Sequence, residues 1–124
     1  MNNKGFTLVE VLVVVIIIGI LASIGIPQFA DSIEKAKGAE ARSGLGHIQT
    51  GEKIYFAERE YYVGSTWADD LDISLSQRYW TFTITTPSST AFIATATRSG
   101  GTRVGQTIWM DQAGTLSGDW EFVY

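Results

Sequence analysis

Glu10 is the residue whose type and position point most directly to a chemical role, because it lies inside a long apolar stretch. Residues 11–26 contain no charged side chain. An ionised carboxylate within a bilayer costs on the order of 2.5–3.5 kcal/mol on insertion scales, and residues that bear this cost are usually functional. A neighbouring cation would offset the cost.

Cleavage between Gly5 and Phe6 would create such a cation. The new amino terminus on Phe6 would lie about one helical turn from Glu10, where it could pair with Glu10 of the same chain or of a neighbouring copy. Buried ion pairs fix geometry better than they add stability. We therefore expect Glu10 to set the register of one subunit against the next.

The element that carries Glu10 has the length of a membrane-spanning helix. Residues 6–26 would extend over roughly 31 Å as a helix, and the hydrocarbon layer of a bilayer is about 30 Å thick. The β-branched run at residues 13–18 is also typical of a buried strand. The length of the apolar stretch, in which Gly19 and Gly25 are tolerated, favours a membrane helix.

Three interpretations of this segment differ in how it is processed. In the first it is an ordinary secretory signal peptide, cleaved after the apolar stretch near Ala22 and Ser23. In the second it is a plain single-pass anchor. In the third it belongs to a precursor with a very short leader that is cut before Phe6. Glu10 favours the third, because a carboxylate hinders simple insertion and has no use in a plain anchor.

The run Gly5-Phe6-Thr7-Leu8-Val9-Glu10, followed by the apolar stretch and Pro27, resembles the N-terminal signature of type IV pilins and type II secretion pseudopilins. The resemblance covers about the first thirty residues. It implies that a membrane-embedded prepilin peptidase cuts after Gly5 on the cytoplasmic side and methylates the amine of Phe6. It also implies that Glu10 is the acid that registers subunits, residues 1–5 the leader peptide, and residues 6–26 the transmembrane and filament-core helix.

Pro27 is expected to kink or locally melt this helix, because it lacks an N–H and clashes with the preceding turn. Gly19 and Gly25 lie just upstream and soften the same stretch. By resemblance, residues 19–27 would melt when the subunit enters a filament. The alternative is that Pro27 only marks the point where the chain leaves the membrane, and both can hold.

Residues 27–58 are predicted to continue the helix in amphipathic form, since apolar residues recur mostly every three or four positions. Charged residues, Glu52 among them, are expected on the solvated face. The interior glycines each cost up to about 1 kcal/mol relative to Ala. They indicate either close packing against the rest of the protein or a locally weak helix; they are Gly38, Gly44, Gly46 and Gly51.

The C-terminal part is expected to be a connecting loop at residues 59–78 and a small antiparallel sheet at residues 79–124. Alternating bulky and Thr residues predict strands at 79–85 and 91–97, a third at 106–110 and a short fourth at 120–124. One face should pack on the helix, and its expected residues are Phe82, Ile84, Phe92 or Ile93, and Ile108. The fold class is therefore α+β, and the resemblance makes it the pilin-like fold.

Composition limits the other function classes. The net charge is −4, whereas a general nucleic-acid binder would usually be basic, so no specific nucleic-acid partner is expected. With no Cys and a single His, neither a Cys-based triad nor a zinc site can be assembled, and we expect no enzyme and no cofactor. By resemblance to major pseudopilins, Asp111 and Asp119 are candidate calcium ligands. Ca²⁺ takes about six to eight oxygens, so these two acids alone do not make a calcium site.

The sequence thus predicts a structural subunit of a type IV pilus. Its partners would be copies of itself, the inner membrane before assembly, the prepilin peptidase and a pilus or secretion assembly platform. It would be a single-pass inner-membrane protein with a periplasmic globular part, and then part of a surface pilus or a periplasmic pseudopilus. The alternative is a type II secretion pseudopilin, and the third possibility is a plain membrane-anchored binding domain.

Overall fold

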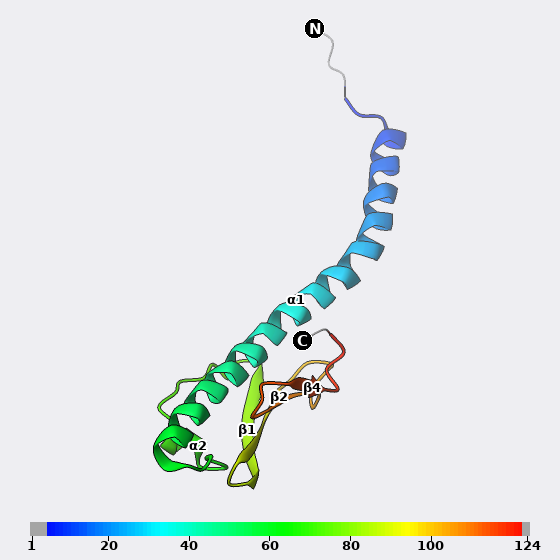
Figure 1. Cartoon of the computed structure of the whole chain (residues 1–124). Coiled ribbons are helices and arrows are strands. Elements are labelled where there is room, and N and C mark those ends of the chain that lie inside the picture. Colours follow the sequence, from blue (N-terminus) through cyan, green and yellow to red (C-terminus); the bar gives the residue numbers. More distant parts are fainter. Residues whose placement is uncertain (1–4, 123–124) are drawn as a thin grey trace. The chain divides into compact units, whose positions relative to one another are not determined.

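The computed structural model of the chain describes residues 5–122 and contains a long helix, a short helix and a four-stranded antiparallel sheet. Helix α1 spans Leu8–Arg59 and α2 spans Trp67–Asp70 (Figure 1). The chain divides into two compact units at residue 34. The first is the apolar part of α1, and the second, which we call the globular unit, holds the rest of α1 and the sheet.

The sheet has the order β1-β2-β3-β4, so each strand pairs with its neighbour in sequence. The strands are β1 (Trp80–Ser88), β2 (Ala91–Arg98), β3 (Thr107–Asp111) and β4 (Leu116–Gly118). Phe82 is paired with Ala96, and Ala96 with Ile108, across the first three strands. This is the antiparallel meander predicted from the period-two alternation, and the α+β fold class is confirmed.

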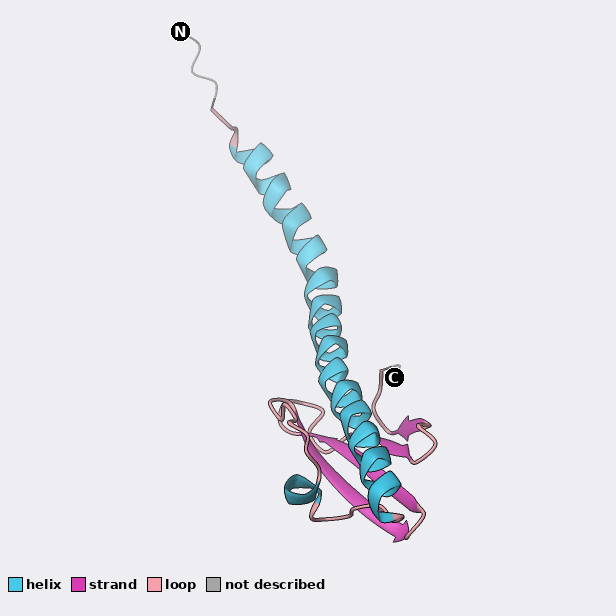
Figure 2. Cartoon of the chain, turned by 60° about the vertical axis from the view of Figure 1, so that its left-hand side comes forward, coloured by secondary structure: helices cyan, strands magenta, loops and turns pink. Residues whose placement is uncertain are grey.

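One face of the sheet carries the core and packs on α1. Phe82, Ile84, Phe92 and Ile108 are all buried, as predicted; between the two candidates in β2, Phe92 faces the core and Ile93 the opposite side. They form one cluster with Ala41, Leu45 and Ile48 of α1. Figure 2 shows this part of α1 lying across the sheet.

Glycines in α1 allow this close approach. A Cβ on Gly44 would lie 2.2 Å from the ring of Phe82, whereas a Cβ on Gly46 would meet nothing within 4 Å. Gly38 and Gly51 face Trp120 and Ile73 at 3.2 and 3.1 Å by the same measure. Close packing therefore accounts for three of these four helix glycines.

Glu52 contradicts the prediction of a uniformly solvated charged face. Its side chain is fully buried, and its Oε2 accepts a hydrogen bond from the backbone N–H of Val63 at 2.9 Å. The other carboxylate oxygen has no hydrogen-bond partner among the described residues. The reversal of the chain after α1 explains the burial, because Glu60 takes a positive φ of 63° and the segment that follows covers this turn of the helix.

The predicted fourth strand at residues 120–124 is wrong as far as the structure describes it, since residues 123–124 lie outside the described part. The fourth strand lies earlier, at β4, where Met110 pairs with Leu116. Trp120 instead leaves the sheet, donates its backbone N–H to the carbonyl of Thr107 at 3.1 Å, and buries its ring against Trp80. The connecting segment also differs, because it contains α2.

Candidate assembly site

The first turn of α1 is closed by a reciprocal capping box formed by Thr7 and Glu10. The backbone N–H of Thr7 donates to the Glu10 carboxylate at 3.2 Å, and the N–H of Glu10 donates to the Thr7 hydroxyl at 3.1 Å. Two of the donors that a helix start leaves unpaired are satisfied in this way. Sequence reasoning did not identify Thr7, although a Thr three residues before a Glu and ahead of an apolar run is the usual signal.

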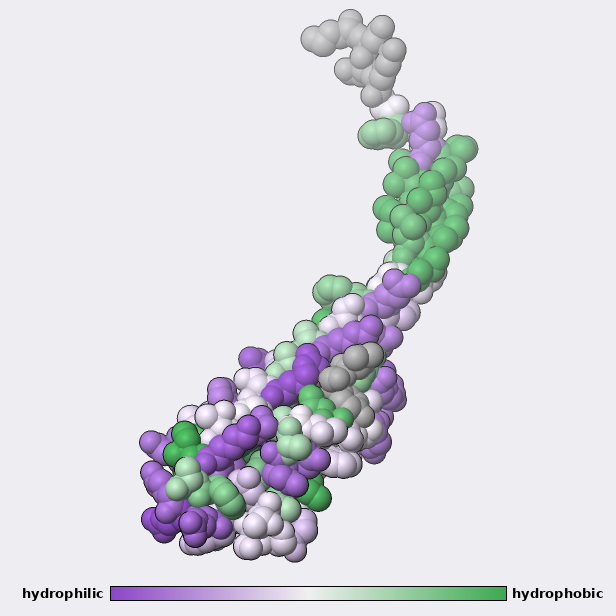
Figure 3. Space-filling view, in the orientation of Figure 1, coloured by the Kyte–Doolittle hydropathy of each residue, from purple (hydrophilic) through white to green (hydrophobic). Residues whose placement is uncertain are grey.

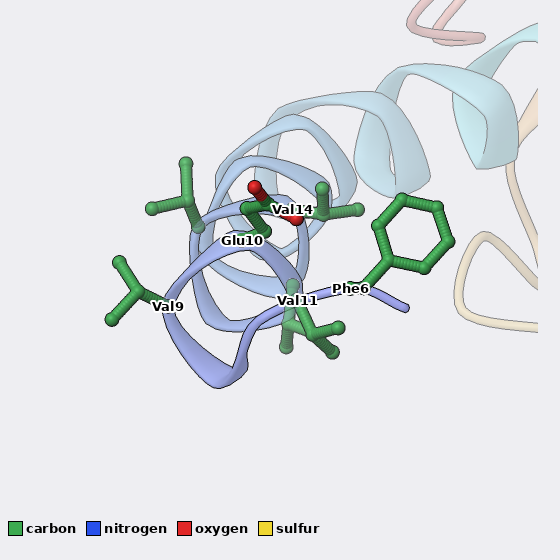
Figure 4. Close-up of a pocket in the computed structure, with 7 residues that line it drawn as sticks. Phe6, Val9, Glu10, Val11 and Val14 are labelled. Atoms are coloured by element: carbon green, nitrogen blue, oxygen red, sulfur yellow. The ribbon is translucent and has the colours of Figure 1, made fainter. Parts of the chain in front are cut away.

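The surroundings of Glu10 are apolar. The residues around it form an open hollow on the helix surface, and Glu10 alone among them carries a charge. Figure 4 shows its carboxylate among Val9, Val11 and Val14, with Phe6 projecting from the chain just before the helix. Once lipid or other helices cover this apolar surface, the Glu10 carboxylate loses the contact with water that an ordinary surface acid keeps.

The predicted cleavage junction lies immediately before the helix. Gly5 and Phe6 are exposed and precede the first helical residue, Leu8. A Cβ on Gly5 would meet nothing within 4 Å. Residues 1–4, the rest of the predicted leader, lie outside the described part of the chain. The geometry leaves this bond accessible in the described segment, and its cleavage remains a prediction.

The apolar half of α1 exposes its side chains on every side. Among residues 8–26, exposed fractions of the large apolar side chains run from 47% at Val13 to 86% at Leu8, and Figure 3 shows the resulting green surface. Within the described residues, this is the one helix long and apolar enough to cross a membrane. A helix that is hydrophobic all round must be covered by lipid or by other helices.

Pro27 and the two glycines upstream lie in unbroken helix in this structure. A Cβ on Gly19 or Gly25 would meet nothing within 4 Å, so close packing inside the described chain does not explain these two glycines. Nearby, the Ser23 hydroxyl donates to the carbonyl of Ile20 at 2.7 Å. Melting of residues 19–27 on assembly therefore stays a prediction about another state of the protein.

The two candidate calcium ligands are engaged by protein donors. Asp111 accepts hydrogen bonds from the backbone N–H groups of Ala113 and Thr115, each at 3.0 Å. Asp119 accepts from the N–H and the hydroxyl of Thr107, and these donors lower the pKa of its carboxyl below the ordinary value. Across residues 5–122, no group of three or more His, Cys, Asp or Glu side chains is placed to hold a metal.

Two protein-family models match the chain. One, described as the prokaryotic N-terminal methylation motif, matches residues 1–26. The other, described as type IV minor pilin ComP, DNA uptake sequence receptor, matches residues 27–107. The first model coincides with the segment that holds Gly5, Phe6 and Glu10, and the second includes most of the globular unit.

Curated relatives carry pilin and secretion names. The chain is 45% identical over 61 residues to the type IV major pilin protein PilA of Myxococcus xanthus (strain DK1622), covering 49% of this chain and 28% of the relative. It is 28% identical over 95 residues to the fimbrial protein EcpC of Eikenella corrodens, covering 77% and 62% respectively. It is 36% identical over 61 residues to the type II secretion system core protein G of Escherichia coli (strain K12), covering 49% and 42%.

Each of these matches covers only part of the relative. The chain spans between 28% and 62% of the length of these three proteins. No solved structure gives a significant match. The model covering residues 27–107 spans more than half of the chain, and it agrees with the N-terminal motif and with the observed fold. The chain therefore belongs to the type IV pilin family.

Proposed function

We propose that the chain is a structural subunit of a type IV pilus, assembled through the apolar half of α1. The observation that carries this proposal is the apolar surface of residues 8–26, which is exposed on all sides and interrupted by one carboxylate. Lipid covers such a surface before assembly, and neighbouring copies of the same helix can cover it afterwards. As a member of a family of structural subunits, the chain is not an enzyme.

Processing would supply Glu10 with a charged partner. Cleavage after Gly5 frees the amine of Phe6, and methylation keeps that amine positively charged. Support comes from the N-terminal methylation motif matched by residues 1–26 and from the exposed position of Gly5. The amine of one subunit then pairs with Glu10 of its own or a neighbouring subunit, and this pairing sets the axial register.

The same chemistry would serve a type II secretion pseudopilin, which is the second candidate. The similarity to core protein G favours it. Both assemblies need the membrane helix, the processed Phe6 and a filament-forming surface. They differ in where the filament is found, since a pilus extends from the cell surface and a pseudopilus stays in the periplasm.

The name of the second family model includes a DNA receptor, and we propose no such role for this chain. Its net charge of −4 repels phosphates at long range, whereas DNA binding gains most of its affinity from phosphate neutralisation.

The location of the filament tests the proposal. Cells that express the full chain are sheared, and the released filaments and the membranes are probed separately with an antibody against the globular unit. A pilus subunit is expected in the sheared filaments as well as in the membranes. A multimer confined to the envelope would favour the pseudopilin, and a subunit that forms no multimer in either fraction would contradict both candidates.

A further inference from the structure

Trp109 is the one tryptophan of the chain whose position the hydrophobic core does not explain. Of the four tryptophans, Trp80 and Trp120 lie in the core and Trp67 packs against it. Trp109 belongs to neither group. It is half-buried in β3, and its two neighbours in that strand face the core. Because side chains of a strand point to opposite faces in turn, Trp109 lies on the face of the sheet that does not pack on α1.

Threonines surround Trp109 on this outer face. Residues paired across strands share a face, and Thr83 pairs with Thr95, which pairs in turn with Trp109. In the adjacent row, Thr81 pairs with Thr97, which pairs in turn with Thr107. We call this surface the threonine face; its residues are Thr81, Thr83, Thr95, Thr97, Thr107 and Trp109.

The threonine face offers hydroxyl groups and no charge. Within residues 5–122, no hydrogen bond engages the hydroxyls of Thr83, Thr95 and Thr97. The Thr81 hydroxyl donates to the Thr97 carbonyl at the long distance of 3.4 Å, and that of Thr107 bonds to an aspartate. None of the six side chains is charged, although 18% of the residues of the chain are. Hydroxyls beside a tryptophan ring are therefore available to a neutral ligand.

The chemistry of the threonine face narrows the class of partner. It holds no cation, whereas a nucleic acid is bound largely through neutralised phosphates. A protein interface has an apolar centre, but on this side of β1, β2 and β3 only Trp109 and Ile93 are large and apolar. The carboxylate of Asp111, further along β3, is engaged by the backbone of the following turn. A partner that combines apolar C–H surface with many hydroxyls, and carries no charge, fits this face best.

We propose that the threonine face binds a neutral polysaccharide, with Trp109 stacked on a sugar ring and Thr83 and Thr95 hydrogen-bonded to sugar hydroxyls. A sugar ring presents C–H groups on its faces and hydroxyls around its edge. The negative face of an aromatic ring attracts such C–H groups, and a threonine hydroxyl can both donate and accept. Neighbouring threonines lie about 6.7 Å apart along a strand and about 4.8 Å apart across strands, so a sugar chain would meet an ordered grid of hydroxyls.

Sedimentation of the full-length protein with microcrystalline cellulose and with chitin tests this binding, because both particles are neutral and present flat sugar faces. The protein is kept in a detergent without a sugar headgroup, so that the detergent does not compete. Trp109→Ala should weaken binding by about tenfold or more, and Trp109→Phe, which keeps an aromatic ring, should retain most of it. Tyr61→Ala is the matched control, since Tyr61 is an exposed aromatic residue outside the threonine face, and it should bind like the wild type.

A pair of isosteric substitutions tests the hydroxyls separately from the ring. Thr83→Val combined with Thr95→Val keeps the size of both side chains and removes two hydrogen bonds to the sugar, so binding should weaken by about fivefold or more. Thr50→Val combined with Thr90→Val removes two hydroxyls at exposed positions outside the face and should leave binding unchanged. Circular dichroism and thermal unfolding of every variant identify any loss that comes from misfolding. Equal binding by the two pairs would overturn the role of the hydroxyls.

The proposal fails if the wild type sediments with neither polysaccharide, or if a folded Trp109→Ala variant binds as tightly as the wild type. Filament yield separates sugar binding from a contact between subunits, because Trp109→Ala should form filaments at the wild-type yield. Lost filaments with unchanged polysaccharide binding would assign the face to a second copy of the chain. A single subunit carries the whole face, so this inference goes beyond the proposed filament function and stands or falls independently of it.

Discussion

At the scale of single residues, Glu10 has two roles that can be separated. The structure shows it closing the helix with Thr7, and the proposed function assigns it to subunit register. A cap is worth about 1 kcal/mol, which a helix embedded in lipid can lose without unfolding. Register requires the charge itself. The two roles therefore respond differently to substitutions at Thr7 and at Glu10.

Glu10→Val should leave membrane insertion intact and lower filament yield by about tenfold or more, because the buried amine of Phe6 would lose its counter-charge. Thr7→Val keeps the size of the side chain and removes the capping hydroxyl, and it should keep yield within about twofold of wild type. Yield in sheared filaments, relative to membrane subunit, measures both. Equal losses in the two variants would mean that capping is the whole role of Glu10.

Glu52 makes the stability of the globular unit depend on pH. Burial raises the pKa of this carboxyl from 4.5 to about 7, and the hydrogen bond from Val63 only partly opposes the rise. The folded state therefore binds more protons than the unfolded state between these values. The free energy of unfolding should fall as pH rises from about 4.5 to about 7 and then level off, with a total loss of about 3 kcal/mol from this group.

Glu52→Gln should remove that pH dependence and stabilise the protein above pH 7, since the amide keeps an oxygen for the Val63 N–H and never ionises. Thermal unfolding of the full chain in detergent, followed by circular dichroism from pH 4.5 to pH 8, measures the effect. Glu58→Gln is the matched control, because Glu58 lies on the same helix and is exposed. The same pH profile for Glu52→Gln and for wild type would show that Glu52 stays ionised when folded.

At the scale of elements, the fit of α1 against the sheet depends on Gly44. Gly44→Ala should lower the free energy of unfolding by about 1–3 kcal/mol, because the new methyl would overlap the Phe82 ring. Gly46→Ala, two residues away with open space around its Cα, should instead add up to about 1 kcal/mol through helix propensity. Denaturant unfolding of both variants in detergent checks the difference. A stabilised Gly44→Ala would mean that helix and sheet are packed less closely than the structure shows.

The elements also show which parts of the fold the sequence predicts. Alternation in β1 places Phe82 and Ile84 on one face and so identifies the core side without tertiary information. In β2 both Phe92 and Ile93 are apolar, and only the pairing with β1 decides between them. A three-residue strand such as β4 has too few positions to show a period, so its location could not be read from the sequence.

In the candidate site, too, the sequence predicts the features that depend on neighbouring residues and misses those that depend on tertiary contacts. An acid inside an apolar stretch singles out Glu10 from local chemistry, and the resemblance to the pilin signature predicts the roles of Gly5 and Phe6. The burial of Glu52 depends on how the chain returns after Glu60, and helical periodicity placed it on the solvated face.

At the scale of the whole molecule, the chain combines a long apolar helical segment with a globular unit built on an antiparallel sheet. In the proposed function, the apolar surface of the helix holds the subunit in the membrane before assembly and packs against other copies in the filament core. In the proposed function, subunit register through Glu10 depends on processing, because cleavage before Phe6 creates the amine that would pair with Glu10.

The most direct test of this account is mass spectrometry of the N-terminus of protein recovered from sheared filaments and, separately, from membranes. The account predicts a mature chain that begins with N-methylated Phe6 in the filaments. Gly5→Leu, which replaces the small residue at the junction, should leave the full-length precursor in membranes and no filaments. A wild-type chain that keeps Met1 in every fraction, or mature protein of normal size from Gly5→Leu, would contradict the account.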